Sequence, residues 1–341
     1  MIVRARAPLR LGLAGGGTDV SPYCDTHGGY VMNAAIERYA NVVLKINDEP
    51  VVRFVASDQQ IEVTSSVDEA LALDGKLDLH KAVYKQMMQR YNNGKRLPIE
   101  LTTFCDAPAG SGLGSSSTLV VAMIKVFVEL LNAPIDEYAI AQLAFNIERV
   151  ECGLQGGRQD QYSAAFGGFN FMEFYAEERT NINPLRIKNW IICELESSLV
   201  LFSTGISRES ARIIADQSNN VKQGAVNTIQ AMHGIKREAL VMRESLLRGD
   251  FKRLVQSMCL GWENKKSSAK TVSNPYIDKI YDAAITAGAL AGRVSGAGGG
   301  GFMLFFVPAE KRMAVIRELN KFEGQVSNCH FTKHGCQAWR V

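Results

Sequence analysis

The segment PAGSGLGSSSTL, residues 108–119, constrains the fold of this chain strongly. Its alternating glycines, Gly110, Gly112 and Gly114, permit positive φ angles and a close approach of the backbone to another group. Three serines then open an almost wholly apolar run that ends at Leu131, and such a helix belongs in a core. Because the first amides of a helix have no internal partner, they favour an anion. The segment predicts either an anion-binding loop or a plain turn with a serine N-cap.

Neither common nucleotide-binding pattern fits this loop. The chain contains no G-x-x-x-x-G-K-[ST] sequence, so the loop lacks the lysine of a phosphate-binding P-loop. The spacing G-x-G-x-G also lacks the third glycine of a dinucleotide fingerprint. The sequence therefore disfavours a plain P-loop enzyme and a dehydrogenase.

The charge pattern narrows the class of partner. Among 341 residues, 38 basic and 35 acidic side chains are interspersed, which gives a net charge of +3 and no basic stripe for nucleic acid. The longest apolar run, 119–131, is too short to span a bilayer, and no secretory signal is visible. Seven scattered cysteines suit a reducing compartment. We expect a cytoplasmic protein with a small-molecule partner and no nucleic acid or membrane partner.

Periodicity predicts an α+β chain in two domains. Strand composition occurs at 2–6, 40–46, 51–55, 61–65, 97–104, 199–204 and 302–307. Helical patterns cover 78–91, 115–131, 136–150, 222–248, 250–266 and a stretch from Pro275, which Asn274 would cap. The periodicity lapses at 176–190, so we place the domain boundary between residues 185 and 186, which gives domains 1–185 and 186–341.

Three further segments carry a family resemblance. They are APLRLGLAGGGTDV at 7–20, GGRQDQYSAAFGG at 156–168 and VSGAGGGGFMLFF at 294–306. With residues 108–119, and in this order, they resemble the GHMP kinases, the superfamily of galactokinase, homoserine kinase and mevalonate kinase. The likeness is strongest to the D-glycero-D-manno-heptose 7-phosphate kinases, in GGGTD, QDQYSAAFGGFNF and TGISRESARII. It implies a ribosomal-protein-like N-terminal domain, a ferredoxin-like C-terminal domain and ATP-dependent phosphorylation of a sugar.

The resemblance also implies a set of ATP and Mg²⁺ contacts. The ATP-binding residues would be Gly110, Ser111, Gly112, Leu113, Gly114, Ser115, Ser116, Ser117, Gly298 and Gly299. Ser116 and Glu148 would hold Mg²⁺, with Glu151 as a rival carboxylate. Without the family likeness, Ser116 reads as a helix cap and Glu148 as a surface partner of Arg149 or Arg158.

The likeness assigns the chemistry to Asp160 and Arg10. Asp160 would accept or orient the proton of the attacking hydroxyl, since phosphoryl transfer depends mainly on alignment and charge neutralisation. Arg10 would pair with Asp160 and offset charge on the transferred group. The alternatives are a turn or N-cap aspartate and a surface cation at a strand end.

Sugar recognition is expected at the GGGTD segment and at nearby cations. The substrate residues would be Thr18, Asp19, Gly157, Arg158, Arg208 and Arg212. Asp19 can accept two hydroxyl hydrogen bonds, and glycines 15–17 replace the bulkier GEH of galactokinases, which leaves room for a larger sugar. Arg208 is the leading candidate for the substrate phosphate because it would lie in a first helical turn; a solvated helix face is the alternative for Arg208 and Arg212.

These implications combine into one expected activity. The enzyme would use ATP and Mg²⁺ to phosphorylate the anomeric hydroxyl of a heptose 7-phosphate, giving the 1,7-bisphosphate for nucleotide-activated heptose in bacterial surface glycans. Alternatives are another sugar kinase, such as a fucokinase or a galactokinase-like enzyme, and a sensor that binds sugar and ATP without turnover. The oligomeric state stays open, with a homodimer as one alternative.

Overall fold

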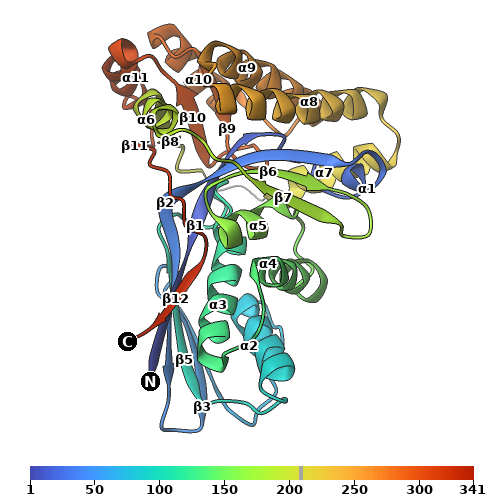
Figure 1. The fold of residues 1–341 in the computed structure, drawn as a ribbon, viewed down its shortest axis with the longest axis vertical. Coiled ribbons are helices and arrows are strands. Elements are labelled where there is room, and N and C mark those ends of the chain that lie inside the picture. The colour runs from blue at the N-terminus through green and yellow to red at the C-terminus, as the bar shows by residue number, and fades with distance from the viewer. Residues whose placement is uncertain (207–209) are drawn as a thin grey trace.

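The computed structural model describes residues 1–206 and 210–341, which form two sheets along the long axis of the molecule (Figure 1). The larger sheet has the strand order β12-β1-β2-β5-β3-β4. In addition, β6 pairs with the first half of β2, and β7 pairs with β6. Its strands are β1 (Ile2–Ala14), β2 (Gly29–Ile46), β3 (Val51–Ala56), β4 (Ile61–Ser66), β5 (Ile99–Cys105), β6 (Phe169–Phe174), β7 (Thr180–Pro184) and β12 (Gln337–Arg340).

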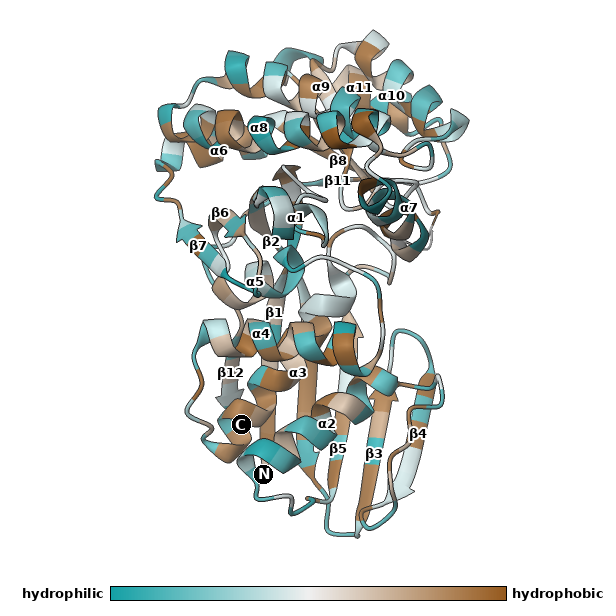
Figure 2. Ribbon diagram, turned by 90° about the vertical axis from the view of Figure 1, so that its right-hand side faces the viewer, coloured by the Kyte–Doolittle hydropathy of each residue, from teal (hydrophilic) through white to brown (hydrophobic). Residues whose placement is uncertain are grey.

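Helices cover one face of this sheet, and the apolar helix that the glycine-rich segment predicts lies at the centre. The helices are α1 (Tyr23–His27), α2 (Asp78–Tyr91), α3 (Ser115–Leu131), α4 (Glu137–Asn146), α5 (Gln159–Phe166) and the π-helical turn η1 (Ile147–Glu151). Residues of α3 such as Val120 and Phe127 are fully buried against β1, β2 and their neighbours. Figure 2 shows the same apolar layer between α3 and the strands behind it.

The second half of the chain forms a smaller antiparallel sheet in the order β11-β8-β10-β9. Strands and helices follow each other as β-α-β-β-α-β with extra helices after the first strand, which is the ferredoxin-like arrangement expected from the sequence. The elements are α6 (Asn189–Ser198), β8 (Leu199–Ser203), α7 (Ser210–Lys222), α8 (Val226–Arg248), α9 (Phe251–Ser268), α10 (Pro275–Ala287), β9 (Ala291–Val294), β10 (Phe302–Phe306), η2 (Ala309–Lys311), α11 (Arg312–Leu319) and β11 (Gln325–Asn328).

The two sheets are joined by the long strands β1 and β2. The second half of β1 and the first half of β2 are buried in a second core, where Leu11 and Met32 pack with Met242 of α8 and Leu304 of β10. The last strand, β12, returns to pair antiparallel with β1. The cleft between the two halves is therefore built on strands that belong to both cores, which fixes the relative positions of its walls.

The structure differs from the sequence predictions at several points: the strand predicted at 2–6 extends to Ala14, and the helix predicted at 136–150 is α4 followed by the π-helical turn η1. The strand predicted at 40–46 is the end of an 18-residue strand, β2, whose first half is buried by neighbours distant in sequence. The helix predicted from residue 222 begins instead at Val226, because the loop after α7 includes Gly224 with φ +69°. The boundary between residues 185 and 186 stays a prediction.

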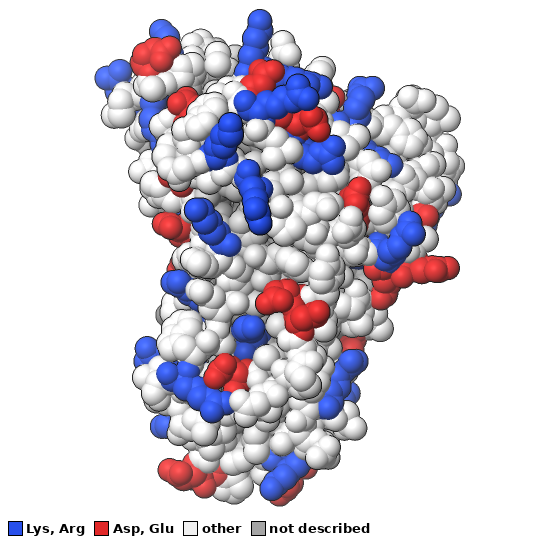
Figure 3. Space-filling view, in the orientation of Figure 1, with Lys and Arg blue, Asp and Glu red and all other residues white. Residues whose placement is uncertain are grey.

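Two surface features bear on the class of partner. On the face in Figure 3, basic and acidic side chains are intermixed, and no continuous basic stripe crosses it. Within residues 1–206 and 210–341, none of the helices combines the length and the apolar character needed to cross a membrane.

Candidate active site

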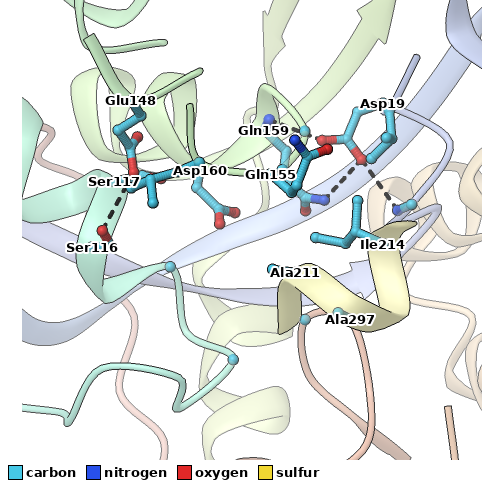
Figure 4. A pocket seen from close by; sticks show the side chains of 18 of the residues that line it. Asp19, Ser116, Ser117, Glu148, Gln155, Gln159, Asp160, Ala211, Ile214 and Ala297 are labelled. Carbon is cyan, nitrogen blue, oxygen red and sulfur yellow. Dashed lines mark hydrogen bonds between the residues drawn. The ribbon is translucent and has the colours of Figure 1, made fainter. Parts of the chain in front are cut away.

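A cavity of about 540 Å³ opens between the glycine-rich loop and the helices of the second half. Its walls come from the start of α3, the loop after β1, the segment before α5, helices α7 and α9, and the loop after β9. In Figure 4, Ser116 and Glu148 lie at one end, Asp19 lies at the other, and Asp160 lies between them. The cavity therefore brings together residues from all four glycine-containing segments.

The glycine-rich loop has the backbone that its composition predicts. Gly112 and Gly114 have φ angles of +77° and +79°, and a β-carbon on Gly114 would lie 3.1 Å from Cγ of Asp160. Helix α3 begins at Ser115 with Gly114 as its N-cap, and no side chain caps it. Ser115 Oγ instead donates to the carbonyl of Pro108. The serine N-cap alternative is thus wrong, and the first-turn amides of α3 are left uncapped by side chains beside the cavity.

Two of the residues predicted to bind ATP hold the loop from behind instead of lining the cavity. Ser111 and Leu113 are both buried. The carbonyl of Leu113 accepts from the backbone N–H of Arg10 at 3.0 Å, and the carbonyl of Ser111 accepts from that of Phe302 at 2.9 Å. These bonds tie the loop to β1 and β10.

The loop after β9 lines the cavity with different residues from those predicted. The N–H of Gly299 donates to the carbonyl of Val272 at 2.8 Å, and a β-carbon on Gly298 would lie 2.7 Å from that same oxygen. Gly296 and Ala297 line the cavity in their place. Gly298 and Gly299 therefore support the loop from the side of Val272.

Asp160 and Arg10 form the ion pair that the resemblance implies. Arg10 Nε lies 2.7 Å from Asp160 Oδ1, and the arginine side chain is only 4% exposed. The guanidinium also donates to the carbonyl of Gly112 at 2.6 Å and to Ser295 Oγ at 3.3 Å. Asp160, 22% exposed at the start of α5, keeps its other oxygen beside Gly114. Arg10 thus fixes Asp160 against the glycine-rich loop.

Ser116 and Glu148 come together at the other end of the cavity. Ser116 Oγ donates to Glu148 Oε1 at 3.4 Å, and Gln161 Nε2 donates to Oε2 at 2.5 Å. Burial raises the pKa of Glu148, whereas the guanidinium of Arg149, with one nitrogen 3.8 Å away, acts to lower it. Glu151 does not line the cavity. A buried carboxylate beside a hydroxyl is an oxygen donor set that suits a hard cation such as Mg²⁺.

Asp19 lines the cavity but is fully engaged by the protein. Its Oδ1 accepts from the N–H of Gly17 and from Gln159 Nε2, at 3.1 and 3.0 Å. Its Oδ2 accepts from the backbone N–H groups of Arg158 and Gln159, at 3.0 and 3.1 Å. Gly157 is obligatory here, since a β-carbon would lie 1.9 Å from Oδ2. Asp19 therefore positions the start of α5, and binding of sugar hydroxyls would require exchange of one of these bonds.

Thr18, also predicted to contact the sugar, is fully buried. Its hydroxyl oxygen lies 2.8 and 2.9 Å from the carbonyl oxygens of Gly15 and Tyr30, which share its single hydrogen, and it accepts from the N–H of Tyr30. Thr18 therefore fastens the GGGTD loop to β2.

Arg158 and Arg212, two of the cations predicted to bind the substrate phosphate, do not line the cavity. The guanidinium of Arg158 points away from the cavity, donates to the carbonyl of Tyr175 at 3.2 Å and pairs with Asp25 at 3.3 Å. Arg212 is exposed, and it lies about 100° around α7 from the cavity-lining position 211. Arg208 lies outside the described residues. Neither described candidate provides a cation to the cavity.

Lys265 is a cavity residue that the sequence did not lead us to predict. It lines the cavity from α9 although its side chain is 2% exposed. A signal was present: Leu254, Met258, Trp262 and Lys265 recur at helical spacing, so the lysine continues the buried stripe of α9. A lysine at such a position calls for a partner within the fold.

Comparison with known proteins supports a common origin for this site. The models for the GHMP kinases N terminal domain and the GHMP kinases C terminal domain match residues 78–168 and 242–324. A Campylobacter jejuni protein named D-glycero-alpha-D-manno-heptose 7-phosphate kinase is 47% identical over 339 residues, with 99% of each chain covered.

Solved structures of GHMP kinases have the same fold as this chain. A protein from Bacteroides thetaiotaomicron titled D-glycero-D-manno-heptose 1-phosphate kinase superposes with a TM-score of 0.84 at 41% identity, over 99% of both chains. Lactococcus lactis galactokinase, solved with galactose, shares the fold with a TM-score of 0.77 at 18% identity, over 98% of this chain and 95% of its own. The chain therefore belongs to the GHMP kinase family and has the family's two-domain α+β fold.

Proposed function

We propose that the protein transfers the γ-phosphoryl group of ATP to the anomeric hydroxyl of D-glycero-D-manno-heptose 7-phosphate and so makes the 1,7-bisphosphate. The observation that carries the proposal is the position of Asp160, fixed by Arg10 between the oxygen pair of Ser116 and Glu148 and the GGGTD end of the cavity. The name of the Campylobacter jejuni relative supports the choice of acceptor.

Each group of residues at the site has a separate role in the phosphoryl transfer. The uncapped amides of the first turn of α3, beside Gly112 and Gly114, bind the phosphates of ATP. Asp160 accepts the proton of the anomeric hydroxyl as that oxygen attacks phosphorus, while ADP leaves with the bridging oxygen. Arg10 keeps the carboxylate in place and contributes positive charge close to the transferred group.

Mg²⁺ fits the end of the cavity that holds Ser116 and Glu148. The hydroxyl and the carboxylate lie 3.4 Å apart on the cavity wall, and both are oxygen donors. When bound there, Mg²⁺ would neutralise charge on the β and γ phosphates. Gln161, which donates to the same carboxylate, would hold Glu148 in orientation for this role.

Replacing Glu148 by glutamine should raise the Mg²⁺ concentration needed for half-maximal activity by more than the roughly 10-fold typical of losing an outer-sphere partner. Because burial raises the pKa of Glu148, the wild-type requirement should also grow as the pH falls toward that raised pKa, and the variant should lose this dependence. Mg²⁺ titrations of initial rate at several pH values measure both effects.

Glu151→Gln is the matched control, since Glu151 bonds to Gln86 outside the cavity. If the initial rates of wild type and Glu148→Gln depend equally on Mg²⁺ concentration, Glu148 does not bind the metal.

The identity of the acceptor needs a direct test because the names of two relatives place its phosphate at opposite ends of the sugar. We expect ADP release with heptose 7-phosphate and little with heptose 1-phosphate, whose anomeric oxygen is already esterified. The panel also contains heptose, fucose, galactose and mevalonate. Turnover of one of the last three in preference would support another kinase activity, and binding of sugar and ATP without ADP release would support a sensor.

The cellular setting is part of the same proposal. An anomeric phosphate is the group from which nucleotide-activated sugars are made, so the product would supply activated heptose for bacterial surface glycans. A cytoplasmic location fits the use of ATP. A homodimer stays a prediction.

A further inference from the structure

The ammonium of Lys265 is buried beside the active-site cavity. Nζ donates to the carbonyl of Gly296. Within residues 1–206 and 210–341, no carboxylate oxygen forms an ion pair with it within 4.0 Å. Lysine carries three N–H donors, so two are left to face the cavity that the side chain lines.

The surroundings of Lys265 are rich in buried positive charge. Arg293 is 3% exposed, and its guanidinium donates to the carbonyl of Leu13 at 2.8 Å. Burial lowers the pKa of Lys265 well below its ordinary value, and the nearby Arg293 and Arg10 lower it further, against smaller opposing effects of Asp19 and Asp160. Such a cluster is costly to bury, and a bound anion would offset that cost.

Gly16 of the GGGTD segment lies beside this ammonium. A β-carbon at Gly16 would lie 3.7 Å from Lys265 Nζ and 3.6 Å from Gln159 Nε2, both ordinary contact distances. The φ angle of Gly16 is not positive, whereas that of Gly15 is +80°. The backbone therefore does not require glycine at position 16, so a substitution there can be used to probe the ammonium.

Two other described cations line the cavity, and each already has a neighbour of opposite charge. Arg10 is paired with Asp160, and Arg149 lies beside Glu148 at the metal end. Lys265 lies beside Gly16 of the GGGTD segment. It is therefore the described cation best placed to meet an anion carried by the acceptor.

We propose that Lys265 binds the phosphate group of the acceptor sugar where its side chain lines the cavity, and thereby sets the preference for a phosphorylated over an unphosphorylated sugar. This inference rests on the proposed function, since it requires a sugar phosphate as acceptor. Lysine is a common point-charge ligand for phosphate, and the contact needs no bidentate geometry.

The test compares kcat/KM for heptose 7-phosphate with kcat/KM for heptose. Lys265→Met should lower the ratio of the two values about 10-fold or more, as expected for loss of a charged hydrogen bond. Removal of a buried charge in favour of an apolar side chain of similar size is compatible with folding. Lys266→Met is the matched control, because Lys266 pairs with Glu263.

A second variant tests the same contact without removing the lysine. Gly16→Asp places a carboxylate within reach of the ammonium, so it should compete with the substrate phosphate and lower the same ratio. If both variants lower kcat/KM equally for the two sugars, the ammonium acts on the transferred group or on the fold, and the inference is wrong.

The two proposals fail in different ways. A wild-type enzyme with no preference for the phosphorylated heptose would contradict the proposed function, and with it this inference. A wild-type preference that survives unchanged in both Lys265→Met and Gly16→Asp would contradict the inference alone.

Discussion

Replacing Asp160 by asparagine is expected to lower kcat by about 10²-fold or more, the usual contribution of a positioned proton acceptor. Asparagine has nearly the same shape, and its amide oxygen can still accept the hydrogen bond that Arg10 Nε donates to Oδ1 at 2.7 Å. The fold and the glycine-rich loop should therefore be retained. What the variant lacks is a carboxylate able to take the hydroxyl proton.

The measurement pairs turnover with binding. Single-turnover rates report the chemical step, and calorimetric titration reports ATP affinity, which should change little. Asp68→Asn, at an exposed position, controls for loss of a negative charge. Turnover of Asp160→Asn close to that of the wild type would exclude Asp160 as the proton acceptor.

Replacing Gly112 by alanine is expected to destabilise the protein by roughly 2–5 kcal/mol, through left-handed strain together with overpacking. Gly112 has φ +77°, and its β-carbon would lie 2.4 Å from the carbonyl oxygen of Ser295. The clash is with the carbonyl oxygen of Ser295 in the opposing loop. Since Arg10 also donates to the carbonyl of Gly112, displacement of the loop should reduce activity as well.

A second glycine separates strain from overpacking. Gly75 has φ +88°, but a β-carbon there would meet nothing within 4 Å. Gly75→Ala should therefore show only the cost of the left-handed backbone, about 1–2 kcal/mol. Thermal unfolding curves of both variants give the comparison. Equal destabilisation by the two substitutions would mean that the contact between Gly112 and Ser295 has no energetic importance.

Local sequence signals predicted much of the fold because they act within a single element. The apolar run after Gly114 gives α3 from Ser115 to Leu131 as expected. Asn274 caps α10 through its side-chain oxygen, which accepts from Tyr276 and Ile277 N–H groups. The positive φ angles of the glycine-rich loop were likewise implied by the residues themselves.

Features that depend on tertiary partners could not be predicted in this way. The strand β12 pairs with β1 although the two are at opposite ends of the chain. The first half of β2 contains Asn33 and Ala34, which have weak strand preference and are held there by burial.

The direction of a side chain was the least predictable property of the site. Arg158 is close to Asp160 in sequence, yet its guanidinium turns toward Tyr175 and Asp25, because a helix presents neighbouring residues to different sides. The ion pair between Arg10 and Asp160 was predicted because the family resemblance connects two segments that lie 150 residues apart. Lys265 belongs to none of the four glycine-rich segments, so only the folded chain shows its place in the cavity.

The most direct test of the proposed function is ³¹P NMR of the product made from heptose 7-phosphate and ATP. We predict a new phosphate monoester signal coupled to the anomeric proton, retention of the original C7 phosphate signal and one ADP formed per sugar. A new phosphate on any other carbon, or no new signal from a protein that binds both ligands, would contradict the assignment of the protein as an anomeric sugar kinase.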